Sequence, residues 1–325
     1  MKVVVVGGAG YIGSHAARIL RKHGHEVLIY DDLSTGFEVL AQGFDMVRAS
    51  IMDRKKLLPA LERAGAVMHF AAFASVGESV QNPRKYFGNN VEGGLSLLNA
   101  CMDAGVKNFI FSSTCAVYGE PARIPITEDT PRAPVNPYGV SKMCFEQALE
   151  AYSRAYGLKF AALRYFNAAG ADESGEIGEM HDPESHLIPL ALQAARGSGP
   201  ALRLFGDDYP TPDGTCIRDY IHVNDLAEAH VLALHHLEET GDSLAVNLGT
   251  GTGHSVREVI TSVEKATGSR VPFSIAPRRP GDPPALVADP SRAETLLRWK
   301  ARYSLDQIVA TAWNWMTRLP TPSRV

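Results

Sequence analysis

Cysteine is scarce in this 325-residue sequence, and long apolar runs are absent. The four cysteines form no CxxC pair, so their spacing indicates neither a zinc site nor a disulfide framework. Sparse cysteines are typical of a reducing compartment, and we expect the cytoplasm. The N-terminal run Val3–Val6 meets a glycine too soon for a signal sequence, and no segment is long and apolar enough to cross a bilayer.

An excess of positive charge is also missing. The chain has 32 Lys and Arg residues against 36 Asp and Glu residues, which gives a formal net charge of −4 at pH 7. Such a balance provides no broad attraction for nucleic acid or for an anionic membrane, so a partner that carries phosphates must be held at a local site. We therefore expect a small-molecule ligand, and neither nucleic acid nor membrane as a partner.

Strand and helix signals alternate through the first half of the chain. Short apolar runs, each the length of a buried strand, are separated by stretches with a helical period. This alternation predicts an α/β fold with a doubly wound parallel sheet that helices cover on both faces. The expected strands are Val3–Val6, Glu26–Tyr30, Ala66–Phe70, Asn108–Ser112 and Lys159–Arg164, and the expected helices are Tyr11–Lys22, Asn82–Ala104 and Pro137–Tyr156.

Beyond Tyr165 the pattern becomes less regular, because residues 168–183 and 197–214 carry many turn-forming and acidic residues. We expect a Rossmann domain over residues 1–165 and a smaller, irregular substrate lobe over 166–325, some of whose strands and helices return to the first domain. Ligands of such sheets bind at the carboxyl ends of the strands, so the second lobe should close over that edge. Its expected helices are Asn224–Leu237, Ser255–Thr267 and Leu305–Arg318.

The first expected strand runs into the glycine-rich loop Gly7-Gly8-Ala9-Gly10-Tyr11-Ile12-Gly13, which a helix follows. Glycines allow a tight turn there and let a pyrophosphate approach the N–H groups of a helix N-terminus. The second strand ends in Tyr30-Asp31-Asp32, about 20 residues on, where a carboxylate would bind the adenosine ribose. Because Asp31 would repel a 2′-phosphate, the loop predicts NAD rather than NADP.

Tyr138 and Lys142 stand four residues apart on an expected helix, so both project from one face. The phenol can move a proton and the ammonium can hold its charge state. Such a pair also occurs on ordinary solvated helices, so by itself it is weak evidence of a site. Thr114, at the end of the fifth expected strand, gives it weight, because its hydroxyl could reach the same substrate oxygen as Tyr138.

Together, these features resemble the extended short-chain dehydrogenase/reductase superfamily. Within that superfamily the chain is most similar to the UDP-glucose 4-epimerase family, from Met1 to about Trp315. The segments that carry this resemblance are Phe70-Ala71-Ala72, Val76-Gly77-Glu78-Ser79-Val80, Asn89-Asn90-Val91, Arg164-Tyr165-Phe166-Asn167, Gly206-Asp207-Asp208-Tyr209-Pro210-Thr211 and Arg218-Asp219-Tyr220-Ile221-His222-Val223.

The resemblance implies an isomerase that interconverts UDP-glucose and UDP-galactose with tightly bound NAD that is not consumed. Tyr138 would take the proton of the sugar 4-hydroxyl while C4 passes a hydride to the nicotinamide, and the 4-keto sugar would turn over and accept the hydride on its other face. The reference pKa of tyrosine is about 10, so Lys142 and the cationic nicotinamide would have to lower it. Thr114 would share the proton.

The resemblance also implies two sets of contact residues and, by analogy, a homodimer through residues 82–104 and 137–156. We expect no metal site. The implied NAD contacts are Gly7, Gly10, Tyr11, Ile12, Gly13, Asp31, Asp32, Leu33, Ser34, Thr35, Gly36, Ser50, Ile51, Phe70, Ala71, Ala72, Ala74, Asn89, Thr114, Tyr138, Lys142 and Phe166. The implied UDP-sugar contacts are Thr114, Tyr138, Asn167, His186, Leu187, Arg203, Leu204, Phe205, Arg218, Arg279, Asp282 and Leu286.

The residues after Thr114 separate this chain from related reactions. Nucleotide-sugar dehydratases and decarboxylases of the superfamily carry acidic residues there, whereas this chain has Cys115-Ala116. Ser50, Ala74, His186 and Leu286 depart from the best-known family pattern, and the size of Leu286 leaves the accepted sugar open. The alternatives are an epimerase for UDP-GlcNAc, UDP-xylose or UDP-glucuronate and, from another class, a non-catalytic Rossmann protein that senses a dinucleotide.

Overall fold

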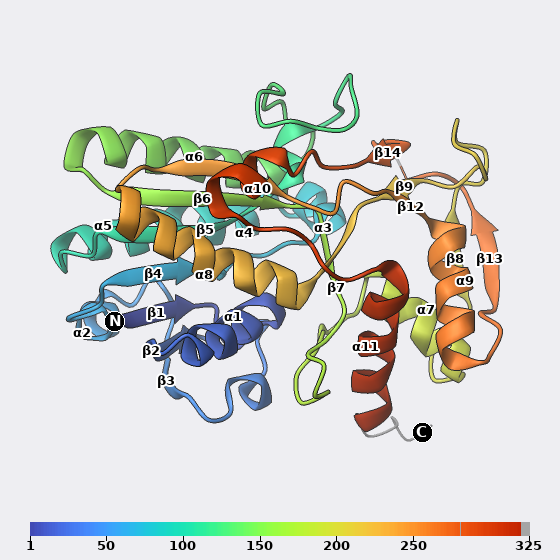
Figure 1. The fold of residues 1–325 in the computed structure, drawn as a ribbon, viewed down its shortest axis with the longest axis horizontal. Coiled ribbons are helices and arrows are strands. Elements are labelled where there is room, and N and C mark those ends of the chain that lie inside the picture. The colour runs from blue at the N-terminus through green and yellow to red at the C-terminus, as the bar shows by residue number, and fades with distance from the viewer. Residues whose placement is uncertain (280, 320–325) are drawn as a thin grey trace.

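The computed structural model describes residues 1–279 and 281–319, and residue 280 and residues 320–325 of the expected second lobe lie outside the described residues. A seven-stranded sheet forms its centre (Figure 1). All neighbouring strands in it are parallel, which confirms the predicted doubly wound sheet. In spatial order the strands are β11 (Leu244–Leu248), β6 (Lys159–Tyr165), β5 (Asn108–Thr114), β4 (Ala66–His69), β1 (Lys2–Val6), β2 (Glu26–Asp31) and β3 (Asp45–Arg48).

Helices cover both faces of this sheet because the strands are apolar on both sides. In β1, successive side chains point to opposite faces, so Val3 and Val5 join one core while Val4 and Val6 join the other. The first face is covered by α1 (Tyr11–Lys22), α8 (Val223–Thr240) and α10 (Ser291–Leu297), and the second by α2 (Arg54–Leu61), α5 (Gly94–Asp103) and α6 (Pro137–Tyr156).

The second lobe is built from α7 (Leu187–Arg196), α9 (Val256–Thr267) and α11 (Leu305–Arg318), which share one core and stand together in Figure 1. The chain passes between the lobes more than once, because α8 packs on α1 and β11 pairs with β6 after the first part of the second lobe. The short strands of this half are β7 (Asn167–Ala169) with β10 (Tyr220–His222), β8 (Leu202–Phe205) with β13 (Phe273–Ala276), and β12 (His254–Ser255), β9 (Ile217–Arg218) and β14 (Ala285–Leu286).

The expected helix Asn82–Ala104 is not a single α-helix. It begins as α4 (Pro83–Tyr86), widens into a π-helical segment over Phe87–Gly93 and continues as α5. Such π-helical turns are frequent at functional sites. Strand β3 and helix α2 are not among the elements expected from the sequence. Both are short, and their apolar residues are too few to show a strand or helix period. The remaining helical elements are α3 (Val76–Gln81) and two 3₁₀ turns, Glu38–Ala41 and Cys115–Tyr118.

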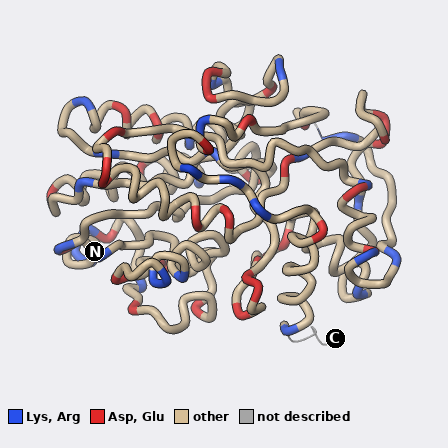
Figure 2. Tube along the Cα trace, viewed as in Figure 1, with Lys and Arg blue, Asp and Glu red and all other residues tan. Residues whose placement is uncertain are grey.

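Charges of both signs are interspersed over both lobes, as Figure 2 shows. Within residues 1–279 and 281–319, no helix combines the length and apolar character that crossing a membrane requires.

Candidate active site

A cavity of about 900 Å³ lies where the carboxyl ends of the central strands face the second lobe. It begins at the loop after β1, where the strand order reverses between β4 and β2, which is the usual place for a ligand of a doubly wound sheet. Most residues predicted from the sequence line it: Gly7, Gly10, Tyr11, Ile12, Gly13, Asp31, Asp32, Ser34, Thr35, Gly36, Ile51, Phe70, Ala71, Ala72, Ala74, Asn89, Thr114, Tyr138, Lys142, Phe166, Asn167, His186, Arg218, Arg279, Asp282 and Leu286.

Six predicted residues do not line the cavity, namely Leu33, Ser50, Leu187, Arg203, Leu204 and Phe205. The Leu204 side chain is 1% exposed in the core of the second lobe, because alternate residues of β8 face that core. Phe205 lies one step away from the cavity, since its ring centroid is 4.0 Å from the Arg279 guanidinium, which does line it. Leu187 and Leu204 do not line the cavity, and their expected contact with the UDP-sugar stays a prediction.

The glycine-rich loop is shaped by close backbone contacts. Gly7 has a φ of +83°, and a Cβ there would lie 2.4 Å from the backbone nitrogen of Ala71. A Cβ on Gly13 would lie 2.2 Å from the Gly7 carbonyl oxygen, so only glycine fits at either position. At Gly10, which caps α1, the nearest atom would be 3.3 Å away. The first N–H groups of α1 border the cavity and have no acceptor within the helix. They are therefore free to donate to the pyrophosphate of a dinucleotide.

Asp31 is held in place at the end of β2. Its carboxylate accepts hydrogen bonds from the backbone nitrogens of Ala9 at 2.9 Å and Leu33 at 2.8 Å. Burial raises the pKa of this carboxyl group, and the two hydrogen bonds oppose that shift. Each carboxylate oxygen keeps a further lone pair, so the group could also accept from ribose hydroxyls.

Thr114, Tyr138 and Lys142 meet at the carboxyl end of β5. Thr114 ends the strand, while Tyr138 and Lys142 stand on the first two turns of α6, whose N-terminus is capped by the Asn136 side chain through the Gly139 nitrogen at 2.9 Å. The Lys142 ammonium donates to the Ser112 carbonyl at 2.7 Å and lies 5.9 Å from the centroid of the Tyr138 ring. The sequence could not reveal this use of the Ser112 backbone.

Burial dominates the electrostatics of the pair. It raises the pKa of Tyr138 to about 12, and a hydrogen bond with Thr114 opposes the shift. Burial lowers the pKa of Lys142 to about 7, although the charge of Glu146 acts in the opposite direction. We expected Lys142 to lower the pKa of Tyr138, but its ammonium is directed to Ser112 and is not among the groups that shift the phenol.

Replacing Lys142 by methionine should stabilise protein freed of nucleotide at pH 6. Between pH 7 and 10.5 the unfolded chain binds a proton that the folded protein has lost, so the stability of the wild type rises with pH across this window. Burying the ammonium costs about 5 kcal/mol below pH 7, and an unpaired Ser112 carbonyl in the variant costs about 1–3 kcal/mol. We expect a gain of roughly 2–4 kcal/mol in urea unfolding at pH 6. A difference that does not shrink towards pH 10 would contradict this account.

A buried ion pair supports the base of the site. Glu146 of α6 is 1% exposed, and its Oε2 accepts from the Arg164 guanidinium of β6 at 2.6 Å. Its other oxygen accepts from Ser113, next to Thr114, at 2.5 Å. Burial would raise the pKa of Glu146, but the Arg164 hydrogen bonds and charge outweigh it and hold that pKa below its usual value. The pair was not predicted, because its members lie far apart in the sequence.

Asn90 is a second residue that sequence reasoning missed. Its side chain accepts from the Phe73 nitrogen at 3.0 Å and donates to the Phe73 carbonyl and to the Ser141 hydroxyl, each also at 3.0 Å. It therefore joins the loop after β4 to α6, next to Lys142. Glu179 and His181, which also line the cavity, were not predicted either, although the alternation of acidic residues and histidines near His186 could have indicated them.

The second lobe brings two arginines to the cavity. Arg218 of β9 pairs with Asp282, and β9 lies beside β14, so that Leu286 is the register partner of Arg218. Arg279 borders the same space. A guanidinium group can donate two parallel hydrogen bonds to phosphate oxygens, so Arg218 and Arg279 could bind a diphosphate.

Comparisons with known proteins agree with this geometry. Residues 3–249 match the NAD dependent epimerase/dehydratase family. The UDP-glucose 4-epimerase of Rhizobium meliloti (strain 1021) is 49% identical over 320 residues, which cover 97% of each chain. The crystal structure of UDP-glucose 4-epimerase from Brucella ovis in complex with NAD has a TM-score of 0.94 at 54% identity, covering 96% of this chain and 97% of that one.

A further solved structure, UDP-glucose 4-epimerase from Stenotrophomonas maltophila with bound NAD and formylated UDP-arabinopyranose, has a TM-score of 0.94 at 45% identity. It covers 98% of this chain and 99% of that chain. The family match spans most of the chain, and the relatives are matched over nearly their whole length. The chain therefore belongs to the NAD dependent epimerase/dehydratase family.

Proposed function

We propose that this protein is a UDP-glucose 4-epimerase that interconverts UDP-glucose and UDP-galactose with bound NAD. The observation that carries the proposal is that Thr114, Tyr138 and Lys142 share one cavity with the glycine-rich loop. The similarity to named epimerases over nearly the whole chain supports the same activity. The NAD-binding role of the loop and of Asp31 is part of this proposal.

The proton chemistry falls to three residues. When bound, NAD would supply a hydride acceptor for sugar C4, return the hydride to the other face, and lower the pKa of Tyr138 through the positive charge of its ring. Tyr138 removes the proton of the 4-hydroxyl as C4 is oxidised and returns it when C4 is reduced. Thr114, hydrogen-bonded to Tyr138, orients the phenol towards the sugar oxygen. Lys142, whose ammonium donates to the Ser112 carbonyl, stands beside the phenol and would help to orient the bound NAD.

Elimination of water from the sugar is disfavoured by the residues after Thr114. Cys115 and Ala116 both line the cavity, where a dehydratase needs an acid and a base. Burial raises the pKa of the Cys115 thiol to about 12, so it stays neutral and transfers no proton at pH 7. Proton transfer at the 4-oxygen by Tyr138 is then the chemistry that remains.

A panel of UDP-sugars tests the proposal directly. Purified protein should release NAD on denaturation and should equilibrate UDP-glucose with UDP-galactose. Faster turnover of UDP-GlcNAc, UDP-xylose or UDP-glucuronate would favour one of the alternative epimerases. Bound NAD without turnover of any of these sugars would instead favour a non-catalytic, dinucleotide-sensing role.

Enlarging Leu286 to tyrosine should narrow the range of sugars. Leu286 is half-buried, lines the cavity and packs against the apolar cluster that includes Phe166, so the ring of a tyrosine would fill space near the sugar. We expect the kcat/KM ratio of UDP-GalNAc to UDP-galactose to fall about 10–100-fold, a typical effect of pocket size. Leu286→Met, which nearly conserves volume, serves as the control. Unchanged turnover of the N-acetylated sugar in the tyrosine variant would remove Leu286 as the determinant.

We also propose that the protein is a homodimer in the cytoplasm. The face formed by α5 and the preceding π-helical segment carries a shallow groove that includes Met52, Phe87, Val91 and Leu95. Met52 is 50% and Phe87 38% exposed, and both line this one groove, as grouped apolar side chains at an interaction surface do. Sedimentation equilibrium at micromolar concentration would test the dimer, and a single species of monomer mass would contradict it. Detection of the protein in the soluble cytoplasmic fraction of cells would test the compartment.

A further inference from the structure

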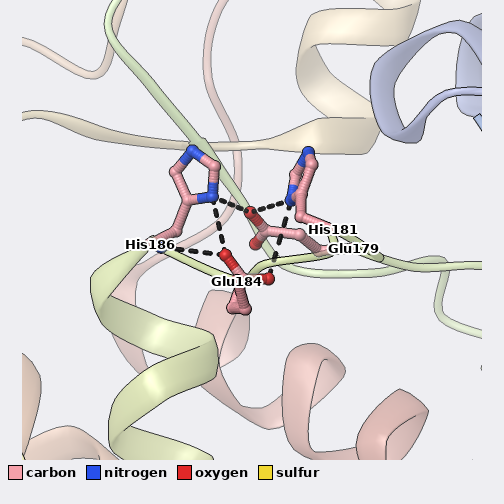
Figure 3. Close-up of side chains that lie close together, drawn as sticks. All are labelled: Glu179, His181, Glu184 and His186. Carbon is pink, nitrogen blue, oxygen red and sulfur yellow. Dashed lines mark hydrogen bonds and ion pairs between the residues drawn. The ribbon is translucent and has the colours of Figure 1, made fainter. Parts of the chain in front are cut away.

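Two glutamates and two histidines gather on the connection between β7 and α7. Glu179, His181, Glu184 and His186, here called the acid–histidine cluster, each offer a ligand atom, and these atoms all lie within 4.8 Å of one another. Figure 3 shows the two imidazole rings side by side, with the bonded nitrogen of each ring turned towards the carboxylates. The cluster is outside the proton relay and involves none of its three residues.

We propose that the acid–histidine cluster binds one divalent transition-metal ion of the zinc class through two imidazole nitrogens and two carboxylate oxygens. Four zinc ligands at about 2.0–2.1 Å in a tetrahedron are about 3.3 Å apart. The His186 Nδ1 lies 3.0 Å from a Glu179 oxygen and 2.9 Å from a Glu184 oxygen. The His181 Nδ1 lies 3.4 Å and 3.6 Å from oxygens of the same two carboxylates. These separations bracket the tetrahedral value.

The two imidazoles of the cluster are not equally well hydrogen-bonded. The His186 Nδ1 donates to Glu184 at 2.9 Å, whereas the buried His181 Nδ1 makes no hydrogen bond and lies only at ion-pair distance, 3.4 Å and 3.6 Å, from the two carboxylates. Buried polar atoms without partners are uncommon in proteins. One ion at the centre would satisfy both imidazoles and both carboxylates, and its two positive charges would balance the two negative charges of the glutamates.

The surrounding contacts hold the donors in place. The Glu184 carboxylate accepts from the backbone nitrogens of Ser185 at 2.7 Å and of His186 at 2.8 Å, which fixes its orientation. The Glu179 carbonyl accepts from the Trp315 indole of α11 at 3.0 Å, which ties its backbone to the second lobe. Metal ligands oriented by such outer contacts bind more tightly than free side chains.

The site would act on the cavity wall rather than on the reacting atoms. Glu179, His181 and His186 line the cavity, and His186 precedes the first residue of α7. A bound ion would therefore fix the segment 179–186 as a rigid wall next to the second lobe. This inference does not depend on the proposed function, because the donor geometry is the same whatever the ligand of the cavity.

Zinc binding by full-length protein tests the inference. After treatment with EDTA and gel filtration, the protein should take up one Zn²⁺ per chain, measured by plasma mass spectrometry and by competition with a chelating dye. His181→Ala combined with His186→Ala should weaken binding at least ~100-fold. His236→Ala, on α8 and outside the cluster, should bind as the wild type does. Added Zn²⁺ should raise the Tm of the wild type and of His236→Ala only.

Isosteric variants guard against misfolding of the alanine variants. Glu179→Gln combined with Glu184→Gln keeps the shape of both side chains, should retain the wild-type circular dichroism spectrum and should lose stoichiometric zinc. No uptake of zinc by the wild type at micromolar free Zn²⁺, or uptake that both double variants retain, would overturn the proposal. The expectation of no metal site, drawn from the sequence, is decided by the same measurement.

Discussion

Replacement of Tyr138 by phenylalanine is expected to lower kcat for conversion of UDP-galactose by roughly 10²–10⁴-fold, the usual contribution of a positioned acid–base group. Only the hydroxyl that meets Thr114 is lost, and the ring that packs 6.5 Å from the Tyr86 ring is kept. The NAD content of the purified variant should therefore equal that of the wild type. Steady-state kinetics with a coupled UDP-glucose assay, together with the absorbance of released nucleotide, measures both quantities.

Tyr152→Phe provides the matched control on the same helix. The Tyr152 hydroxyl donates to Asn99 at 2.7 Å, and neither residue lines the main cavity. Its kcat should stay within a factor of about two of the wild type, because an exposed hydrogen bond of this kind contributes little. Full activity of Tyr138→Phe would mean that another group moves the proton, and it would leave the family assignment untouched.

Glu146→Gln should lower the free energy of unfolding by about 3–5 kcal/mol, the usual cost of leaving one member of a buried ion pair without its partner. The substitution nearly keeps the shape of the side chain but removes the charge that faces Arg164, whose side chain is 6% exposed. Urea unfolding at pH 7 gives the difference. Because Glu146 also accepts from Ser113, we expect a loss of activity beyond the loss of folded protein.

Glu150→Gln is the control for this second prediction. Glu150 lies one turn further along α6 and shares Arg132 with Glu146, at 3.0 Å and 2.9 Å respectively, but the Glu150 side chain is 37% exposed. Exposed pairs contribute about 0.2–1 kcal/mol, so this variant should unfold almost as the wild type does. Similar effects of the two substitutions would show that Glu146 is solvated in solution. A double variant with Glu146→Leu and Arg164→Met should recover part of the lost stability, because it removes both buried charges, although Ser113 and Arg132 still lose their bonds to Glu146.

The features predicted from the sequence are those whose residues lie close together in it. The glycine-rich loop, Asp31 and the Tyr138–Lys142 pair each follow from one strand, one turn or one helical spacing. The structure confirms the doubly wound sheet, and the comparisons confirm the family. Which residues contact NAD and the UDP-sugar stays a prediction, although most of them line one cavity.

The rest depends on contacts between distant segments. Glu146 lies on a helix and Arg164 on a strand, so no local spacing in the sequence predicts their contact. Asn90 likewise contacts a loop and a helix that are distant from it in the sequence. The burial of the Leu204 side chain could not be predicted, because the direction of a side chain on a short strand depends on which face of that strand is covered. The acid–histidine cluster escaped notice because its donors converge only through the bends of an irregular connection.

The return of α8 and β11 to the first sheet limits how this protein can be divided. A fragment that ends at Tyr165 would leave β6 as an unpaired edge and would uncover the apolar residues that α8 covers, such as Leu163 and Ile110. Open edges and bare apolar faces promote association between chains. Because α10 and Trp299 belong to the same core, truncated or fused forms of the protein should keep residues 1–299 on one chain.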